Sequence, residues 1–159
     1  MGPTKRLLDQ LLDEEKLSYC QNCGMCTASC PMARVIPDTY NPRLLLQRAH
    51  LDLEKLTEGE ELWLCSWCYR CTERCPQNIQ PTEIFLLTRN FASEKGNIPP
   101  NPRMIIRNIM RTGRSMPVDE FTNELREDYG LPPVEGVSEK ALEEQRKIMG
   151  DEFVRRIEK

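Results

Sequence analysis

The cysteines of this chain form two copies of one short pattern. In each copy two residues separate the first three cysteines, three more precede the fourth, and proline follows it directly. Thiolates at this spacing are typical of proteins that hold two 4Fe-4S clusters. All eight cysteines belong to the two copies, which are Cys20, Cys23, Cys26 and Cys30 before Pro31, and Cys65, Cys68, Cys71 and Cys75 before Pro76.

The fourth cysteine of each copy is expected to serve the cluster of the other copy. A cubane cluster needs four thiolates, and one loop of this kind can wrap three of its corners. In two-cluster ferredoxins the cysteine before the proline ligates the other cluster. The pattern therefore predicts two 4Fe-4S clusters with crossed ligation. Cluster one would take Cys20, Cys23, Cys26 and Cys75, and cluster two would take Cys65, Cys68, Cys71 and Cys30.

Disulfides and structural zinc are the alternative uses of eight cysteines. Disulfide frameworks fit small secreted chains, whereas this chain begins Met-Gly-Pro-Thr-Lys-Arg and continues without an apolar signal segment. Zinc sites typically combine cysteine pairs from two separated knuckles. Neither explains a third cysteine at the same spacing, a fourth before proline, and the repetition of the whole unit.

Charge and hydropathy restrict the class of protein further. The net charge of -3 argues against a general nucleic-acid binder. No stretch approaches the roughly 20 consecutive apolar residues of a membrane span. We therefore expect a soluble chain without nucleic-acid partners, located in the cytoplasm, where thiols stay reduced.

The remaining residues follow helical rather than strand periodicity. Between the cysteine copies, Asn41 can cap a helix that has Pro42 in its first turn and continues to Ala49. Further helical stretches are expected from Thr4, around Glu60 to Leu64 with Trp63 and Leu64 turned inward, from Pro81 to Gly96, from Asn101, from Val118 to Asp128, and from Ser138.

These stretches predict an all-α protein. Residues 1–98 would form an α-helical ferredoxin-like domain that binds the two clusters. Residues 99–159 would form a helical C-terminal extension for packing or partner docking. Four arginines of the extension recur at helical spacing, and they form either a solvated face or a contact with an acidic partner or phosphate. They are Arg103, Arg107, Arg111 and Arg114.

The chain carries no residues that suggest chemistry of its own beyond electron transfer. It contains no dinucleotide-binding glycine motif, no P-loop and no nucleophile elbow. His50 is the only histidine, and we interpret it as a surface or packing residue. With every cysteine assigned to a cluster corner, no catalytic residue is predicted, and the chain is expected to conduct electrons between partners.

The order of these motifs resembles the iron-sulfur C subunit of heterodisulfide reductase. The resemblance covers residues 1 to about 115 and is carried by Cys20-Gln-Asn-Cys23-Gly-Met-Cys26, by Asn41-Pro42-Arg43, and by Trp63-Leu64-Cys65 before the second copy. The cysteine copies alone also occur in iron-sulfur subunits of succinate dehydrogenase, glycolate oxidase and anaerobic glycerol-3-phosphate dehydrogenase. The Trp-Leu-Cys approach and the short chain favour the heterodisulfide family.

The resemblance implies a non-catalytic electron-transfer subunit of an oxidoreductase complex. In that family a soluble, flavin-based electron-bifurcating complex of methanogens passes electrons from the flavin-containing A subunit through the C subunit to the catalytic B subunit. There the mixed disulfide of coenzyme M and coenzyme B is reduced. A hydrogenase or a formate dehydrogenase would be a further partner in the larger complex. The alternative is a two-cluster subunit of a bacterial heterodisulfide-like complex or of a quinone-linked membrane oxidoreductase.

Overall fold

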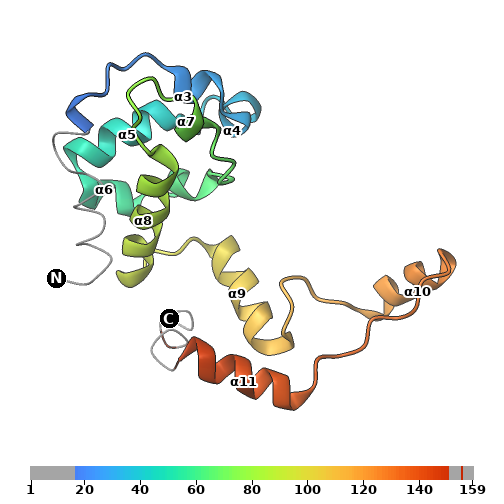
Figure 1. Cartoon of the computed structure of the whole chain (residues 1–159). Coiled ribbons are helices and arrows are strands. Elements are labelled where there is room, and N and C mark those ends of the chain that lie inside the picture. The colour runs from blue at the N-terminus through green and yellow to red at the C-terminus, as the bar shows by residue number, and fades with distance from the viewer. Residues whose placement is uncertain (1–16, 151–154, 156–159) are drawn as a thin grey trace. The chain divides into compact units, whose positions relative to one another are not determined.

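The structure, a computed structural model, describes residues 17–150 and 155. These residues contain helices and no strand, which confirms the all-α prediction (Figure 1). The helix predicted from Thr4 lies outside the described residues. The chain divides into two compact units, Met1–Asn97 and Ile98–Lys159.

Most of the described helices of the first unit are short. Those within and directly after the first cysteine loop and within the second have four or five residues, too few to show a hydrophobic period. In chain order the helices are α3 (Met25–Ala28), α4 (Pro31–Val35), α5 (Pro42–Leu51), α6 (Leu53–Glu58), the 3-10 helix η1 (Glu61–Leu64), α7 (Arg70–Glu73) and α8 (Pro81–Glu94).

Helix α5 begins as the sequence predicted. The Asn41 side chain accepts hydrogen bonds from the backbone N–H groups of Arg43 (3.1 Å) and Leu44 (3.3 Å), and Pro42 occupies the first turn. Proline fits there because its missing N–H would have no partner inside the helix. The predicted start of α5 is therefore confirmed.

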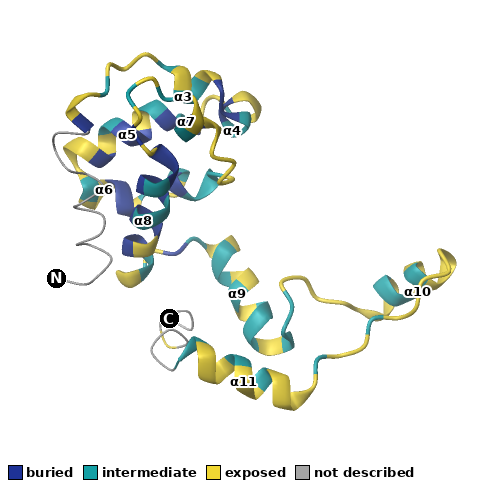
Figure 2. Cartoon of the chain, in the orientation of Figure 1, coloured by how far each residue is buried: buried dark blue, intermediate teal, exposed yellow. Residues whose placement is uncertain are grey.

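The core of the first unit lies where α5, α6 and α8 pack together. Figure 2 shows the buried faces of these three helices turned inward. Burying large apolar side chains of this kind is the main favourable contribution to folding. The most enclosed members of the core include Tyr40, Leu45, Leu56, Leu62, Ile84 and Phe85.

The segment before the second cysteine loop is helical, as expected, and Trp63 and Leu64 turn toward the core as predicted. Leu62 is fully buried, while Trp63 and Leu64 are half-buried and pack against the core. A 3-10 helix has three residues per turn, so one residue of this single turn takes the innermost position. Here that residue is Leu62.

The second unit contains α9 (Pro100–Thr112), α10 (Glu120–Asp128) and α11 (Glu139–Met149). Asp119 caps α10 and Ser138 caps α11, each through a side-chain oxygen that accepts a backbone N–H. Helices α9 and α11 pack together, and Gln145 Nε2 donates to the Ile109 carbonyl at 2.9 Å.

The second unit lacks a closed core within the residues that the structure describes. No residue from 99 to 150 is buried (Figure 2). Side chains of α10 that would normally be buried are exposed, among them Phe121, Leu125 and Tyr129 at the end of the helix. Over residues 17–150 and 155, no helix is long and apolar enough to cross a membrane.

Candidate iron-sulfur cluster site

The two cysteine loops have the same backbone conformation. The second residue after the first cysteine has a left-handed φ in both loops, 52° at Asn22 and 52° at Trp67. The fourth residue does as well, 75° at Gly24 and 60° at Tyr69. Such φ values are rare for bulky side chains and cost free energy. Asparagine and glycine adopt this conformation readily, so the strain falls on Trp67 and Tyr69 of the second loop, and the shared φ values give the two loops similar curvature.

Each loop is fastened to the long helix that follows it through a threonine. Thr27 donates to Asn41 Oδ1 at 2.7 Å and accepts the Arg43 N–H at 3.2 Å. Thr72 donates to Thr82 Oγ1 at 3.0 Å and accepts the Thr82 N–H at 3.3 Å. Thr27 and Thr72 each follow the third cysteine of their loop. The first turns of α5 and α8 therefore bind the two loops through equivalent hydrogen bonds.

Helices α5 and α8 are equivalent over more than their first turns. Both begin with a buried proline, and Arg43 N of α5 and Thr82 N of α8 make the corresponding bond to a loop threonine. Counting from these anchors, every buried position of α5 is also buried in α8. They pair Leu45 with Ile84, Leu46 with Phe85, and Ala49 with Thr88.

The structure brings Cys75 to the first loop. One pocket is lined by Cys20, Cys23, Cys26 and Cys75 together with Gly24 and neighbouring side chains. Burial raises the pKa of the Cys26 thiol, and the Cys71 and Cys20 thiols add to the rise, against hydrogen bonds from Thr27. The four cysteines predicted for cluster one therefore share one space.

Cys30 and two cysteines of the second loop all lie near the buried Tyr40 side chain. Burial raises the pKa of Tyr40, and the nearby sulfurs of Cys65, Cys30 and Cys71 raise it further. Burial also raises the pKa of Cys71, with contributions from Cys65 and Cys68 and an opposing hydrogen bond from Thr82. These interactions connect all four cysteines predicted for cluster two.

The donor set and its spacing fit iron-sulfur clusters. All eight cysteines are free of disulfides. Among the described residues, no three Cys, His, Asp or Glu side chains converge tightly enough to hold a single metal ion. Thiols must lose their protons to bind a metal. When bound, clusters would supply one-electron transfer, and the half-buried Cys26 and buried Cys71 thiols would give up their protons on loading.

The two sets of cysteines are neighbours. Helices α3 and α7, which carry the third cysteine of each loop, pack against each other. The electrostatic interaction of Cys26 with Cys71 spans this packing. Two groups bound in these spaces would lie side by side.

Several residues around the second loop were not predicted from the sequence. Thr82 Oγ1 lies 3.3 Å from Cys71 Sγ, and Tyr69 donates to Glu83 Oε1 at 2.8 Å. Arg89 donates to the Cys65 carbonyl at 2.7 Å. The repeated threonine after the third cysteine was visible in the sequence, but its partners on α8 are recognisable only once the helix is folded against the loop.

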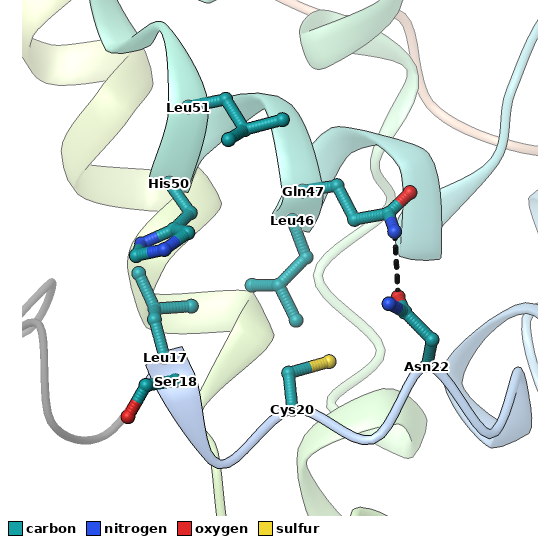
Figure 3. A pocket seen from close by; sticks show the side chains of 8 residues that line it. All are labelled: Leu17, Ser18, Cys20, Asn22, Leu46, Gln47, His50 and Leu51. Atoms are coloured by element: carbon teal, nitrogen blue, oxygen red, sulfur yellow. Dashed lines mark hydrogen bonds between the residues drawn. The ribbon is translucent and has the colours of Figure 1, made fainter.

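His50 and the four arginines, which the sequence also singled out, lie in different parts of the chain. His50 is exposed on α5 and lines a pocket behind the first loop with Leu17, Cys20 and Gln47 (Figure 3). Of the four arginines of the extension, Arg103, Arg107 and Arg111 lie on α9 and Arg114 follows its C-cap; they do not form one uniform solvated face. Arg103 donates to the Ile98 carbonyl at 3.4 Å, and Arg114 donates to the Glu135 carbonyl.

Comparison with known proteins gives consistent findings. The family described as the 4Fe-4S dicluster domain matches residues 16–79. The chain is 35% identical over 139 residues to the C subunit of the H(2):CoB-CoM heterodisulfide,ferredoxin reductase of Methanothermobacter thermautotrophicus, covering 85% of this chain and 74% of that protein. It is 36% identical over 138 residues to the second iron-sulfur C subunit of the CoB-CoM heterodisulfide reductase of Methanocaldococcus jannaschii, covering 85% and 73%. It is 35% identical over 133 residues to the C subunit of the ferredoxin:CoB-CoM heterodisulfide reductase of Methanosarcina mazei, covering 82% and 81%.

Proposed function

The chain belongs to the family of heterodisulfide reductase C subunits, and we propose that it relays electrons from a flavin-containing A subunit to a catalytic B subunit. Membership makes it an iron-sulfur subunit of an oxidoreductase complex with a role in electron transfer. The order of the relay, the non-catalytic role and the identities of the neighbouring subunits are the proposal.

We assign the ligands of two 4Fe-4S clusters in the crossed arrangement. Three cysteines of each loop hold one cluster, and Cys75 and Cys30 are exchanged between the loops. The observation that carries the proposal is the pocket in which Cys75 joins Cys20, Cys23 and Cys26. Crossed ligands tie the two halves of the first unit together and keep the two electron carriers adjacent.

In this proposal the chain holds the two clusters in place and sets their surroundings, and it makes or breaks no bond of the substrate. The loop threonines hold each loop against the following helix, and the buried Tyr40 side chain lies near Cys30, Cys65 and Cys71. Burial, net charge and hydrogen bonds to sulfur are the means by which a protein adjusts a cluster's reduction potential. The catalytic B subunit would use the electrons to reduce the heterodisulfide of coenzyme M and coenzyme B.

We infer that the partner subunits, rather than this chain, determine which electron donor the complex uses. The relative from Methanothermobacter is named for hydrogen and the relative from Methanosarcina for ferredoxin. A hydrogenase or formate dehydrogenase is thus a candidate neighbour of the A subunit in a bifurcating complex. We place the complex in the cytoplasm because a reducing compartment keeps the cluster thiols available.

We assign the C-terminal extension to partner docking. Residues 99–150 bury no side chain, and α10 exposes Phe121, Leu125 and Tyr129 at intervals of four residues. Residues four apart lie on the same side of a helix. An apolar stripe of this kind gains free energy when a second surface covers it.

Anaerobic purification from the native host tests the proposed function. Mass spectrometry of the co-purifying chains should find a cysteine-rich B subunit together with a flavin-containing one. Addition of the heterodisulfide to the dithionite-reduced complex should then restore the visible absorbance of the clusters. A cytochrome or quinone-linked partner, or no reoxidation by the heterodisulfide, would contradict the proposal.

A further inference from the structure

A buried guanidinium lies directly behind the second cysteine loop. The Arg89 side chain on α8 donates from Nε to the Leu62 carbonyl at 3.0 Å and from Nη2 to the Cys65 carbonyl at 2.7 Å. Only 6% of the residue is exposed. Arginine is almost never this buried unless it is paired. Its burial here places a fixed positive charge beside a proposed cluster ligand.

The rings of two tryptophans lie against the Arg89 guanidinium. The Arg89 Cζ atom lies 4.7 Å from the ring centroid of Trp67 and 5.6 Å from that of Trp63. Both distances are within the range of cation-π interactions. Trp67 is also one of the two residues of the second loop with a left-handed φ, so its contact with Arg89 holds a strained position in place. Because the Arg89 residue is itself almost fully buried, it has little contact with water, which would otherwise screen the charge.

Within the described residues, no carboxylate forms a salt bridge with Arg89. The ion pairs there join Arg48 with Glu61 and Lys95 with Glu54. The partners of Arg89 are carbonyl oxygens and aromatic rings. Burial lowers its pKa and the Cys65 sulfur opposes that effect, yet arginine remains protonated in proteins. The positive charge is therefore not neutralised by a nearby acid.

The first loop offers an internal comparison. By the equivalence of α5 and α8, the position of Arg89 corresponds to His50. His50 is exposed, and the space behind the first loop is a pocket that it lines with Leu17, Leu46 and Leu51 (Figure 3). In the first loop Asn22 takes the position of Trp67. It accepts a hydrogen bond on Oδ1 from the neutral Gln47 side chain at 2.8 Å, where Trp67 contacts the charged Arg89. The buried charge is thus specific to the second loop.

We propose that Arg89 is a positioning and tuning residue that raises the reduction potential of the cluster held by the second loop. The inference rests on the ligand assignment proposed above. Each one-electron reduction adds one negative charge to the cluster and its thiolates, and no proton has to move with it. A fixed positive charge in a poorly screened site stabilises that added charge. Arg89 therefore makes the second cluster easier to reduce.

The test is an anaerobic redox titration of the full chain, followed by electron paramagnetic resonance. Cys68→Ser identifies which of the two signals belongs to the second cluster. Arg89→Gln removes the charge but keeps a neutral donor for one carbonyl. We expect the equilibrium constant for reduction of the second cluster to fall about tenfold, equivalent to about 59 mV for one electron. The same replacement at the equivalent position of α5, His50→Gln, should leave this potential unchanged.

Arg89→Lys separates charge from structure. Lysine keeps the positive charge but not the fork that reaches two carbonyls. The second potential should stay within about threefold of the original equilibrium constant. Equal shifts in the Gln and Lys variants, or no shift in Arg89→Gln, would overturn the inference. If Arg89→Gln does not retain the cluster, Arg89→Lys decides, because a tenfold fall despite the kept charge would refute the electrostatic role. Failure of the proposed two-cluster assignment would be distinguishable, because the unsubstituted chain would then lack a second signal or Cys68→Ser would fail to remove one signal selectively.

Discussion

Replacing Thr82 by valine is expected to lower the reduction potential of the second cluster. Thr82 is buried at the start of α8, with Oγ1 3.3 Å from Cys71 Sγ. Its hydroxyl accepts a hydrogen bond from Thr72, so its own proton is available to the sulfur. A ligating Cys71 thiolate can only accept, and Thr82 must then be the donor. Hydrogen bonds to cluster sulfurs favour the reduced, more negative state.

The size of the effect follows from this single bond. A hydrogen bond to a charged group contributes about 1.5–3 kcal/mol. Only the difference between the oxidised and reduced states changes the potential, and a value of roughly 1 kcal/mol corresponds to about 40 mV for one electron. Without clusters, the pKa of Cys71 should be higher in Thr82→Val than in the unsubstituted chain, because the Thr82 hydrogen bond that lowers this pKa is lost.

Thr88→Val is the matched control. Thr88 lies on the same helix, is fully buried, and donates its hydroxyl to the Ile84 carbonyl at 2.7 Å rather than to a sulfur. Redox titration of both variants should show a lowered second potential for Thr82→Val alone. Equal shifts in both variants, or a shift in the first cluster, would refute the reasoning.

Three further changes test the fold and the docking surface. Asn41→Ala removes the cap of α5 and the acceptor of the Thr27 hydroxyl, so the free energy of unfolding should fall by about 2 kcal/mol and the midpoint of anaerobic thermal unfolding by about 10 °C. Phe85→Ala leaves a cavity at a residue that is 0% exposed and should cost about 3–5 kcal/mol in the same assay, while Phe85→Leu should cost clearly less. Replacing Phe121 and Leu125 together by serine should abolish co-purification of partner subunits and leave the visible cluster absorbance unchanged, because both side chains are exposed on α10. Intact co-purification would contradict the docking role of α10.

Much of the helical order could be predicted from local signals. Asn41 before Pro42 is a complete start signal for α5, and Ser138 marks the start of α11. The beginning of α9 differs from the prediction by one residue, since Pro100 rather than Asn101 is the first helical residue. Proline suits the first turn of a helix and supplies its own φ. Signals of this kind act within a few residues, so the sequence carries them directly.

The environment of the second loop could not be predicted in the same way. Arg89 follows Thr88 in an amphipathic helix, and a charged residue there is ordinarily expected at the surface. It is buried because η1 and the second loop, 27 and 24 residues earlier, present the carbonyls of Leu62 and Cys65 to it. Such a partnership depends on tertiary packing and leaves no periodic trace in the sequence. The exposed stripe of α10 is a similar case, because the surface that we propose to cover it is a partner subunit whose sequence is separate from this one.

Crossed ligation is the central claim, and spectra of single cysteine variants test it most directly. Cys23→Ser and Cys68→Ser, each within one loop, provide the reference spectra for damage to cluster one and to cluster two. The account predicts that the reduced Cys75→Ser chain shows the electron paramagnetic resonance spectrum of Cys23→Ser, because Cys75 shares a pocket with the first loop. Cys30→Ser should correspondingly resemble Cys68→Ser. A Cys75→Ser spectrum that matches Cys68→Ser would show that each loop keeps its own fourth cysteine and would contradict the assignment.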